Sequence, residues 1–157
     1  MNSASVSRSE IHDLIAAIVY GETDAVAIMA TVACELHHRF PHFHWTGFYR
    51  VVAPNLLKIG PYQGGHGCLT IPFERGICGR CAREETTVII PDVELEEDHI
   101  ACSSSTRSEI VVPVFDAEGC LRAVLDVDSD LPAAFGEEDA VFLEGVCKHF
   151  RNPEIAW

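Results

Sequence analysis

Three cysteines occupy positions at which thiol chemistry is feasible. Cys102 lies in a run of small and polar residues, IACSSSTRSE, which predicts a loop, and loops are where reactive thiols are usually exposed. Cys68 and Cys78 are each close to glycines, so the backbone could bring either thiol to a partner. A thiol that is oxidised needs a second thiol if disulfide exchange is to reset it. The alternative is that all three are small side chains that only fill space.

Three carboxyl groups accompany these thiols. Asp126 and Asp128 are two residues apart in an apolar run that predicts a strand, so their side chains point to the same face. Glu109 begins the preceding predicted strand and could join them. Carboxylates on a covered face are costly unless they bind a cation or share a proton, whereas a solvated sheet edge or helix caps would need no such role. Beside a thiol, such carboxyls indicate redox chemistry on a small zwitterionic substrate.

An aromatic pair lies on another predicted strand. Trp45 and Tyr49 share one face of it, together with Gly47. Aromatic rings pack well against methyl and thioether groups, so this pair could contact a sulfur-containing substrate. Both residues could equally belong to the core.

Two further patterns could suggest a metal site. Cys78 and Cys81 have C-x-x-C spacing, but no thioredoxin-like βαβ unit surrounds them and no second pair completes a zinc site. We interpret Cys81 as a helical residue without a chemical role. A group of histidines matches no compact ligand motif, and we interpret it as a solvated helix end: His37, His38, His42 and His44. We therefore expect neither a metal nor a cofactor.

The composition argues against several classes of function. The chain has 157 residues and a formal net charge of −13, which repels nucleic acid and anionic lipid. No stretch of 18 apolar residues could span a membrane, and the polar N-terminus does not resemble a signal peptide. We therefore expect a cytoplasmic protein without nucleic-acid or membrane partners. In that compartment the seven cysteines would not form a disulfide scaffold.

The order of the expected elements predicts an α+β fold. It consists of a central antiparallel sheet with helices on one face and loops that roof a pocket on the other. We expect one domain over residues 1–157, with its core at about 10–150. The expected elements are helices at 7–21 and 24–38, strands at 45–52 and 56–60, a short helix ending at 84, a strand at 86–90, a loop at 93–106, strands at 109–115 and 121–128, and a helix at 137–149.

Eight short motifs, in order along the chain, resemble those of the free methionine-R-sulfoxide reductase family, whose members are single GAF-type domains. The resemblance covers residues 10–148. The motifs are Trp45-Thr-Gly-Phe-Tyr49, Gly60-Pro-Tyr-Gln-Gly64, Ile71-Pro72, Gly76-Ile-Cys-Gly79, Pro91-Asp-Val93, His99-Ile-Ala-Cys102, Ser108-Glu-Ile-Val-Val-Pro113 and Val124-Leu-Asp-Val-Asp128.

The resemblance implies a GAF-like fold and reduction of free L-methionine-R-sulfoxide without a prosthetic group. It implies that Cys102 attacks the sulfoxide sulfur and becomes a sulfenic acid, which a second cysteine converts to a disulfide. Cys68 is then the main resolving thiol and Cys78 a further partner, and a thioredoxin-like dithiol protein restores the thiols.

The resemblance also implies the substrate contacts. Glu109, Asp126 and Asp128 would supply a proton to the sulfoxide oxygen and hold the ammonium of the free amino acid. By the same resemblance, contacts to the rest of the substrate come from Trp45, Tyr49, Ile100 and Ala101. A homodimer is compatible with this assignment.

A second class of function stays open. A GAF-like domain could be a sensor that binds a small ligand without catalysis. Such a module is usually attached to an output domain, and it would not need three thiols near its pocket. The two classes differ in whether the thiols turn over with methionine sulfoxide.

Overall fold

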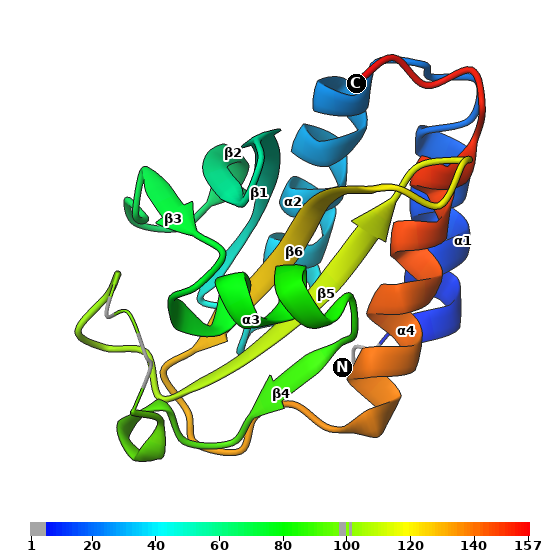
Figure 1. Cartoon of the computed structure of the whole chain (residues 1–157). Helices are drawn as coiled ribbons and strands as arrows, with labels where there is room; N and C mark the ends of the chain where they lie inside the picture. The colour runs from blue at the N-terminus through cyan, green and yellow to red at the C-terminus, as the bar shows by residue number, and fades with distance from the viewer. Residues whose placement is uncertain (1–5, 98–99, 101) are drawn as a thin grey trace, which may run out of the picture.

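The sheet of this protein is antiparallel and six-stranded, with helices on both faces (Figure 1). The structure, a computed structural model, describes residues 6–97, 100 and 102–157. The strands follow the spatial order β3-β2-β1-β6-β5-β4. They are β1 (Trp45–Ala53), β2 (Leu56–Gln63), β3 (Thr70–Pro72), β4 (Val88–Ile90), β5 (Ser108–Phe115) and β6 (Leu121–Ser129).

Three long helices cover one face of the sheet: α1 (Arg8–Ile18), α2 (Ala25–Arg39) and α4 (Glu137–Cys147). Side chains satisfy the first backbone N–H groups of α1 and α2. Ser7 forms a capping box with Glu10, and the carboxylate of Asp24 accepts a hydrogen bond from the backbone of Ala27 at 2.9 Å. The apolar faces of these helices pack against the residues of β5 and β6 that point to this side. These contacts form the larger of the two apolar clusters.

The short helix α3 (Gly76–Glu84) lies on the opposite face, where it packs against β5 and β6 (Figure 1). Cys81 and Ala82 are buried there together with Val111 and Val124. The expected α+β arrangement is confirmed, and the structure adds that a helix joins the loops in covering the pocket face. This helix begins at Gly76, where φ is +72°, a backbone conformation that glycine adopts without steric cost.

The strand register brings the three carboxyl-bearing positions together. Glu109 on β5 is opposite Asp128 on β6, and Asp126 is opposite Gly47 on β1. Side chains alternate along a strand, so these carboxyls share the face that carries α3. The other residues of the same strands, such as Leu125 and Val127, point into the cluster beneath the long helices.

Some boundaries differ from those expected. Strand β2 continues to Gln63 because it pairs with β1 along its whole length, and β4 is shorter than expected, starting at Val88. The expected loop at 93–106 opens with a single 3₁₀ turn, Val93–Leu95. Within the described residues, no helix combines the length and apolar character needed to cross a membrane.

Candidate active site

A small cavity lies between the central strands, the N-terminal end of α3 and the segment that precedes β5. Its volume is about 30 Å³, which is room for little more than one water molecule. Thiols and carboxyls from separate parts of the chain meet in its wall. The lining residues are Ile71, Gly76, Ile77, Cys78, Ile100, Cys102, Ser103, Thr106, Glu109, Asp126 and Asp128.

A disulfide joins Cys68 to Cys102 across 34 positions of sequence. The two Cα atoms are 5.3 Å apart, within the usual range for this bond. Both cysteines are only partly buried, so a reductant can approach the bridge from solvent. The bridge links the connection between β2 and β3 to the loop before β5, which places Cys102 in the cavity wall.

The loop that carries Cys68 lies on the aromatic pair. The indole N–H of Trp45 donates a hydrogen bond to the carbonyl oxygen of Gly65 at 2.8 Å. The backbone of Gly67 is so close to the ring of Tyr49 that a Cβ there would lie 2.9 Å from the hydroxyl oxygen. The two aromatic rings stack at 5.8 Å. They point to the expected face but are buried beneath this loop, and neither lines the cavity.

The three carboxyls in the cavity wall repel one another, and two of them are buried. Glu109 and Asp126 are 6% and 5% exposed. Burial raises the pKa of Glu109 and of Asp128 well above the usual range, and the charge of Asp126 raises both further. Burial also raises the pKa of Asp126, to about 7, against the opposing effect of hydrogen bonds from Cys78 and Glu109. Near neutral pH, Asp126 is therefore the member of this group that most readily carries a negative charge.

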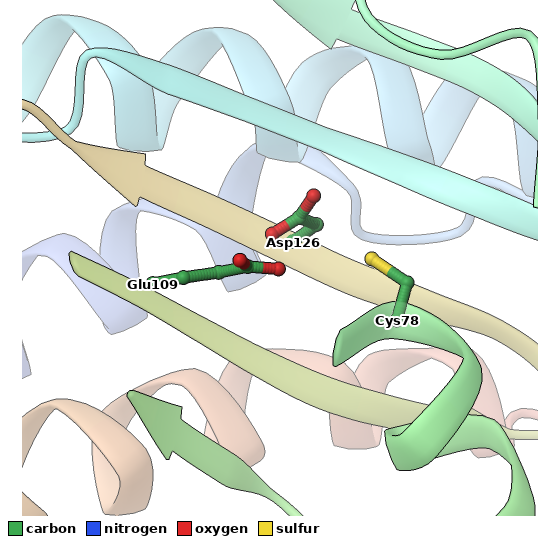
Figure 2. A group of neighbouring side chains, drawn as sticks. All are labelled: Cys78, Glu109 and Asp126. Atoms are coloured by element: carbon green, nitrogen blue, oxygen red, sulfur yellow. The ribbon is translucent and has the colours of Figure 1, made fainter. Parts of the chain in front are cut away.

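Cys78 belongs to this group because its thiol faces Asp126 and Glu109 (Figure 2). Burial raises the pKa of its thiol well above the ordinary value, and the charges of Asp126 and Glu109 add to the effect. It is therefore a protonated thiol at neutral pH. Since the thiolate is the nucleophile, Cys78 is a poor candidate for rapid attack in this arrangement.

Cys81 does not reach the cavity. Its thiol faces the backbone carbonyl oxygen of Val111 at 3.6 Å, and its side chain is fully buried in the cluster beneath α3. Cys81 is free, and so is Cys78, so this C-x-x-C pair does not form a disulfide here.

Arg107 follows the loop that carries Cys102, and its guanidinium pairs with Asp92 at 3.5 Å and with Glu94 at 3.8 Å. Ile100 lines the cavity and lies against the backbone of Gly76, where a Cβ would be 2.9 Å from its Cδ1 atom. Ala101 lies outside the described residues.

Sequence reasoning missed several wall residues, among them Ser103, Thr106 and Ile77. Two signals pointed to this region. Ser103 is next to Cys102, and Ile77 is next to Cys78. Their side-chain chemistry is unremarkable, however, so only the folded arrangement brings them to the cavity.

The histidines near the end of α2 serve separate local contacts. His42 lies among aromatic rings, including Phe43 at 4.8 Å, and His44 accepts a hydrogen bond from the backbone of Asp130 at 3.1 Å. The side chain of His38 reaches the carbonyl oxygen of Cys34 at 2.8 Å. In the described part of the chain, only one group of three potential ligand side chains is close enough to share a metal ion, and it contains Cys78, Glu109 and Asp126 instead.

The raised pKa of Asp126 predicts a pH-dependent cost to stability. The unfolded carboxyl ionises near pH 4, whereas the folded one keeps its proton up to about pH 7. Folded protein therefore binds more protons in this window, and its stability falls as pH rises through it. We expect Asp126→Asn to be more stable than wild type at pH 8, by up to about 4 kcal/mol, with little difference at pH 4.

Denaturant unfolding of both proteins at pH 4, 6 and 8 measures this effect. The exposed Asp13 on α1 provides a control, since Asp13→Asn should show no comparable gain. Equal pH profiles for wild type and Asp126→Asn would contradict the placement of a costly charge at this position.

The fold and the paired cysteines of its pocket define the class of protein, a GAF-type domain with a thiol-lined site. The family model described as GAF domain matches residues 9–152. Among curated relatives, GAF domain-containing protein A of Dictyostelium discoideum is 41% identical over 138 residues, which cover 88% of this chain and 86% of that protein.

Two further relatives carry a more specific name. The free methionine-R-sulfoxide reductase of Escherichia coli is 36% identical over 123 residues, covering 78% of this chain and 73% of that protein. An X-ray structure of the free methionine-R-sulfoxide reductase of Neisseria meningitidis in complex with its substrate is 44% identical, covers 90% of this chain and 84% of that one, and has a TM-score of 0.85. The chain belongs to the free methionine-R-sulfoxide reductase family of GAF-domain oxidoreductases.

Proposed function

We propose that this protein reduces free L-methionine-R-sulfoxide to L-methionine with its own cysteines as the reductant. The observation that carries the proposal is the cavity that Cys102, joined by a disulfide to Cys68, lines together with three carboxyls. A disulfide between cysteines on two loops fits the oxidised end of a thiol cycle. The matched relatives of the same fold are named for this activity.

The first step uses Cys102 and one carboxylic acid. The Cys102 thiolate attacks the sulfoxide sulfur, and a protonated carboxyl donates its proton to the sulfoxide oxygen. The hydroxyl group passes from the substrate sulfur to the sulfur of Cys102 as the transient sulfur–sulfur bond breaks, so methionine leaves and Cys102 becomes a sulfenic acid. The raised pKa values of Glu109 and Asp128 support this assignment, because such groups keep a proton to higher pH than an ordinary carboxyl does.

The second step uses Cys68. Its thiol attacks the sulfenic sulfur of Cys102, a disulfide forms, and water leaves. A thioredoxin-like dithiol then exchanges with the bridge, which restores both thiols and leaves the reductant oxidised. The partial exposure of both cysteines supports this reaction. Cys78 is buried and protonated, so we assign it to the pocket wall and give it at most a slower resolving role.

Substrate selection follows from the charge at Asp126. A free amino acid has an ammonium group, which an ionised Asp126 can hold by a charge-assisted hydrogen bond. The nitrogen of a peptide-bound methionine is an uncharged amide and lacks that interaction. The aromatic pair would contact the methyl and sulfur groups once the overlying loop moves, because the cavity of the disulfide form is too small for an amino acid.

The decisive experiment is a coupled assay. Thioredoxin, thioredoxin reductase and NADPH are supplied, and NADPH consumption is followed with each epimer of free methionine sulfoxide. We expect turnover with the R-epimer and background rates with the S-epimer. Absence of turnover with both epimers, under this reductant and under dithiothreitol, would favour the alternative of a ligand-binding GAF domain without catalysis.

We expect Cys68→Ser to separate reduction from recycling. The variant keeps the attacking thiol, so one equivalent of methionine should form per protein at a rate close to that of wild type. Steady-state turnover with thioredoxin should fall by about tenfold or more, because no rapid internal thiol converts the sulfenic acid to a disulfide. Rapid-quench measurement of methionine, alongside the coupled assay, tests both statements.

The exposed Cys120 offers a matched control for a cysteine on the surface. Cys120→Ser should leave the first turnover and the steady state unchanged. If Cys68→Ser lost its first turnover as well, the division of roles between Cys68 and Cys102 would be wrong.

A further inference from the structure

We propose that Cys78, Glu109 and Asp126 bind a zinc ion in the thiol form of the protein, and that this ion blocks the substrate pocket. One ligand atom from each of these side chains lies within 4.8 Å of the other two (Figure 2). The three side chains come from α3, β5 and β6, so the packing of the sheet and the helix holds them in place. All three are buried.

The second observation is an unpartnered atom. Asp126 is only 5% exposed, and its Oδ1 atom has no hydrogen-bond partner among the residues that the structure describes. None of the ion pairs formed by the described residues includes Asp126, Glu109 or Asp128. Buried carboxylates are normally paired with a base or coordinate a metal. The wall of this cavity therefore lacks positive charge that a cation would supply.

The donor set selects the kind of cation. An ammonium ion needs only oxygen acceptors, and Mg²⁺ and Ca²⁺ prefer oxygen ligands. A thiolate beside two carboxylates suits Zn²⁺, which accepts sulfur and oxygen in a tetrahedral arrangement. Zinc–ligand distances of about 2.0–2.3 Å place neighbouring ligand atoms roughly 3.5 Å apart. Small side-chain rotations would bring the three atoms from their present spacing to that geometry.

A fourth ligand is close at hand in the thiol form. Cys102 lines the same cavity, and reduction of its bridge to Cys68 frees its sulfur. We therefore expect zinc to bind the thiol form more tightly than the disulfide form. The protons held by the thiols of Cys78 and Cys102 and by the carboxyls of Glu109 and Asp126 leave to solvent on binding, with no change of oxidation state.

The neighbouring C-x-x-C cysteine is not a member of this site. Cys81 is directed to the backbone carbonyl oxygen of Val111 and does not line the cavity. It has the same side chain as Cys78, lies in the same helix and is also buried, which makes it a matched control. A site built on the C-x-x-C pair would lose zinc when either cysteine is replaced.

Isothermal calorimetry with Zn²⁺ tests the proposal on the full chain, reduced and then freed of reductant under argon. Wild type should bind one zinc ion, and Cys78→Ala should bind at least about tenfold more weakly. Cys81→Ala should bind as wild type does. Circular dichroism and thermal unfolding of each variant establish that it is folded, and Glu109→Gln, expected to weaken zinc binding similarly, provides a second variant without a cysteine change.

Cobalt absorption gives an independent readout. With Co²⁺ in place of zinc, the wild type should show a thiolate-to-metal charge-transfer band, and the band should weaken in Cys78→Ala but not in Cys81→Ala. An equal loss in both variants would assign the metal to the C-x-x-C pair and overturn the proposal. Zinc binding that Cys78→Ala leaves unchanged would also overturn the proposal, because the ion would then sit elsewhere, for example at the surface pair Cys34 and His38. The absence of binding up to about 100 µM Zn²⁺ would overturn it as well, since protein zinc sites typically have micromolar or tighter affinity.

The blocking of the pocket rests on the proposed function, whereas zinc binding does not. Under that function, zinc should inhibit methionine-R-sulfoxide reduction by competing with substrate, and EDTA should restore the rate. If the metal-free protein has no reductase activity while calorimetry still finds the Cys78-dependent ion, the proposed function fails and the metal site stands. If the protein is active but binds no zinc, the metal site fails and the proposed function stands.

Discussion

Replacing Cys102 by serine should abolish turnover, with thioredoxin and with dithiothreitol alike. A serine hydroxyl is far less nucleophilic than a thiolate at neutral pH, and no other described thiol has the same access to the cavity. Buried Cys78 holds its proton, and Cys68 belongs to the other loop. Loss of an attacking nucleophile typically lowers kcat by about a thousandfold or more. The coupled assay and direct measurement of methionine under single-turnover conditions both quantify the loss.

The control for this substitution is Cys120→Ser, which removes an exposed thiol remote from the cavity. Alkylation of wild type with iodoacetamide gives a complementary test, since prior addition of L-methionine should protect Cys102. A Cys102→Ser protein that is folded and retains more than a few per cent of the wild-type single-turnover rate would transfer the role of nucleophile to another thiol.

The second large effect concerns the charge that holds the amino acid. Asp126→Asn should raise KM for free methionine-R-sulfoxide by about ten- to a hundredfold, because a charge-assisted hydrogen bond is worth about 1.5–3 kcal/mol. Asp128→Asn should instead lower kcat, since Asp128 is one of the two carboxyls proposed to donate the proton. The same Asp126→Asn protein is the one expected to be more stable at pH 8. Loss of activity together with a gain in stability would identify Asp126 as a residue kept for binding.

N-acetyl-methionine-R-sulfoxide tests the same charge from the side of the substrate. Acetylation removes the ammonium, so wild type should use this compound at least about a hundredfold less efficiently than the free amino acid. Asp126→Asn should discriminate much less between the two, because the partner of the ammonium is gone. Comparable wild-type efficiencies with both compounds would refute the ammonium site.

The fold was largely predictable where the signal is local. Period-two alternation placed Asp126 and Asp128 on one face of a strand, and the expected starts of the first two helices, Ser7 and Asp24, are their N-cap residues. The side of the sheet on which α3 lies was not predictable in this way. A helix of only two to three turns takes its position from contacts with β5 and β6, and those contacts join residues that are distant in sequence.

The site was predictable in composition but not in arrangement. Sequence pointed to Cys102, Glu109 and the paired aspartates, and the strand register explains why they meet. Connectivity between cysteines cannot be deduced from spacing, so the choice of Cys68 depended on resemblance. The prediction for the aromatic pair was correct in part. Its face follows from parity, but the cover over it depends on the hydrogen bond from Trp45 to Gly65, which no local pattern indicates.

The two apolar clusters, one on each side of the sheet, contribute differently to folding and binding. The rear cluster, beneath α1, α2 and α4, contains most of the fully buried side chains, whereas the front cluster lies beneath α3 and the loops that meet at the disulfide. Substitutions at positions that share no partners tend to be additive in free energy. The front layer can therefore be rebuilt for other small zwitterions while the rear layer continues to supply the free energy of folding. Amide hydrogen exchange should show the same division, with α3 exchanging through local openings at lower free energy than α2.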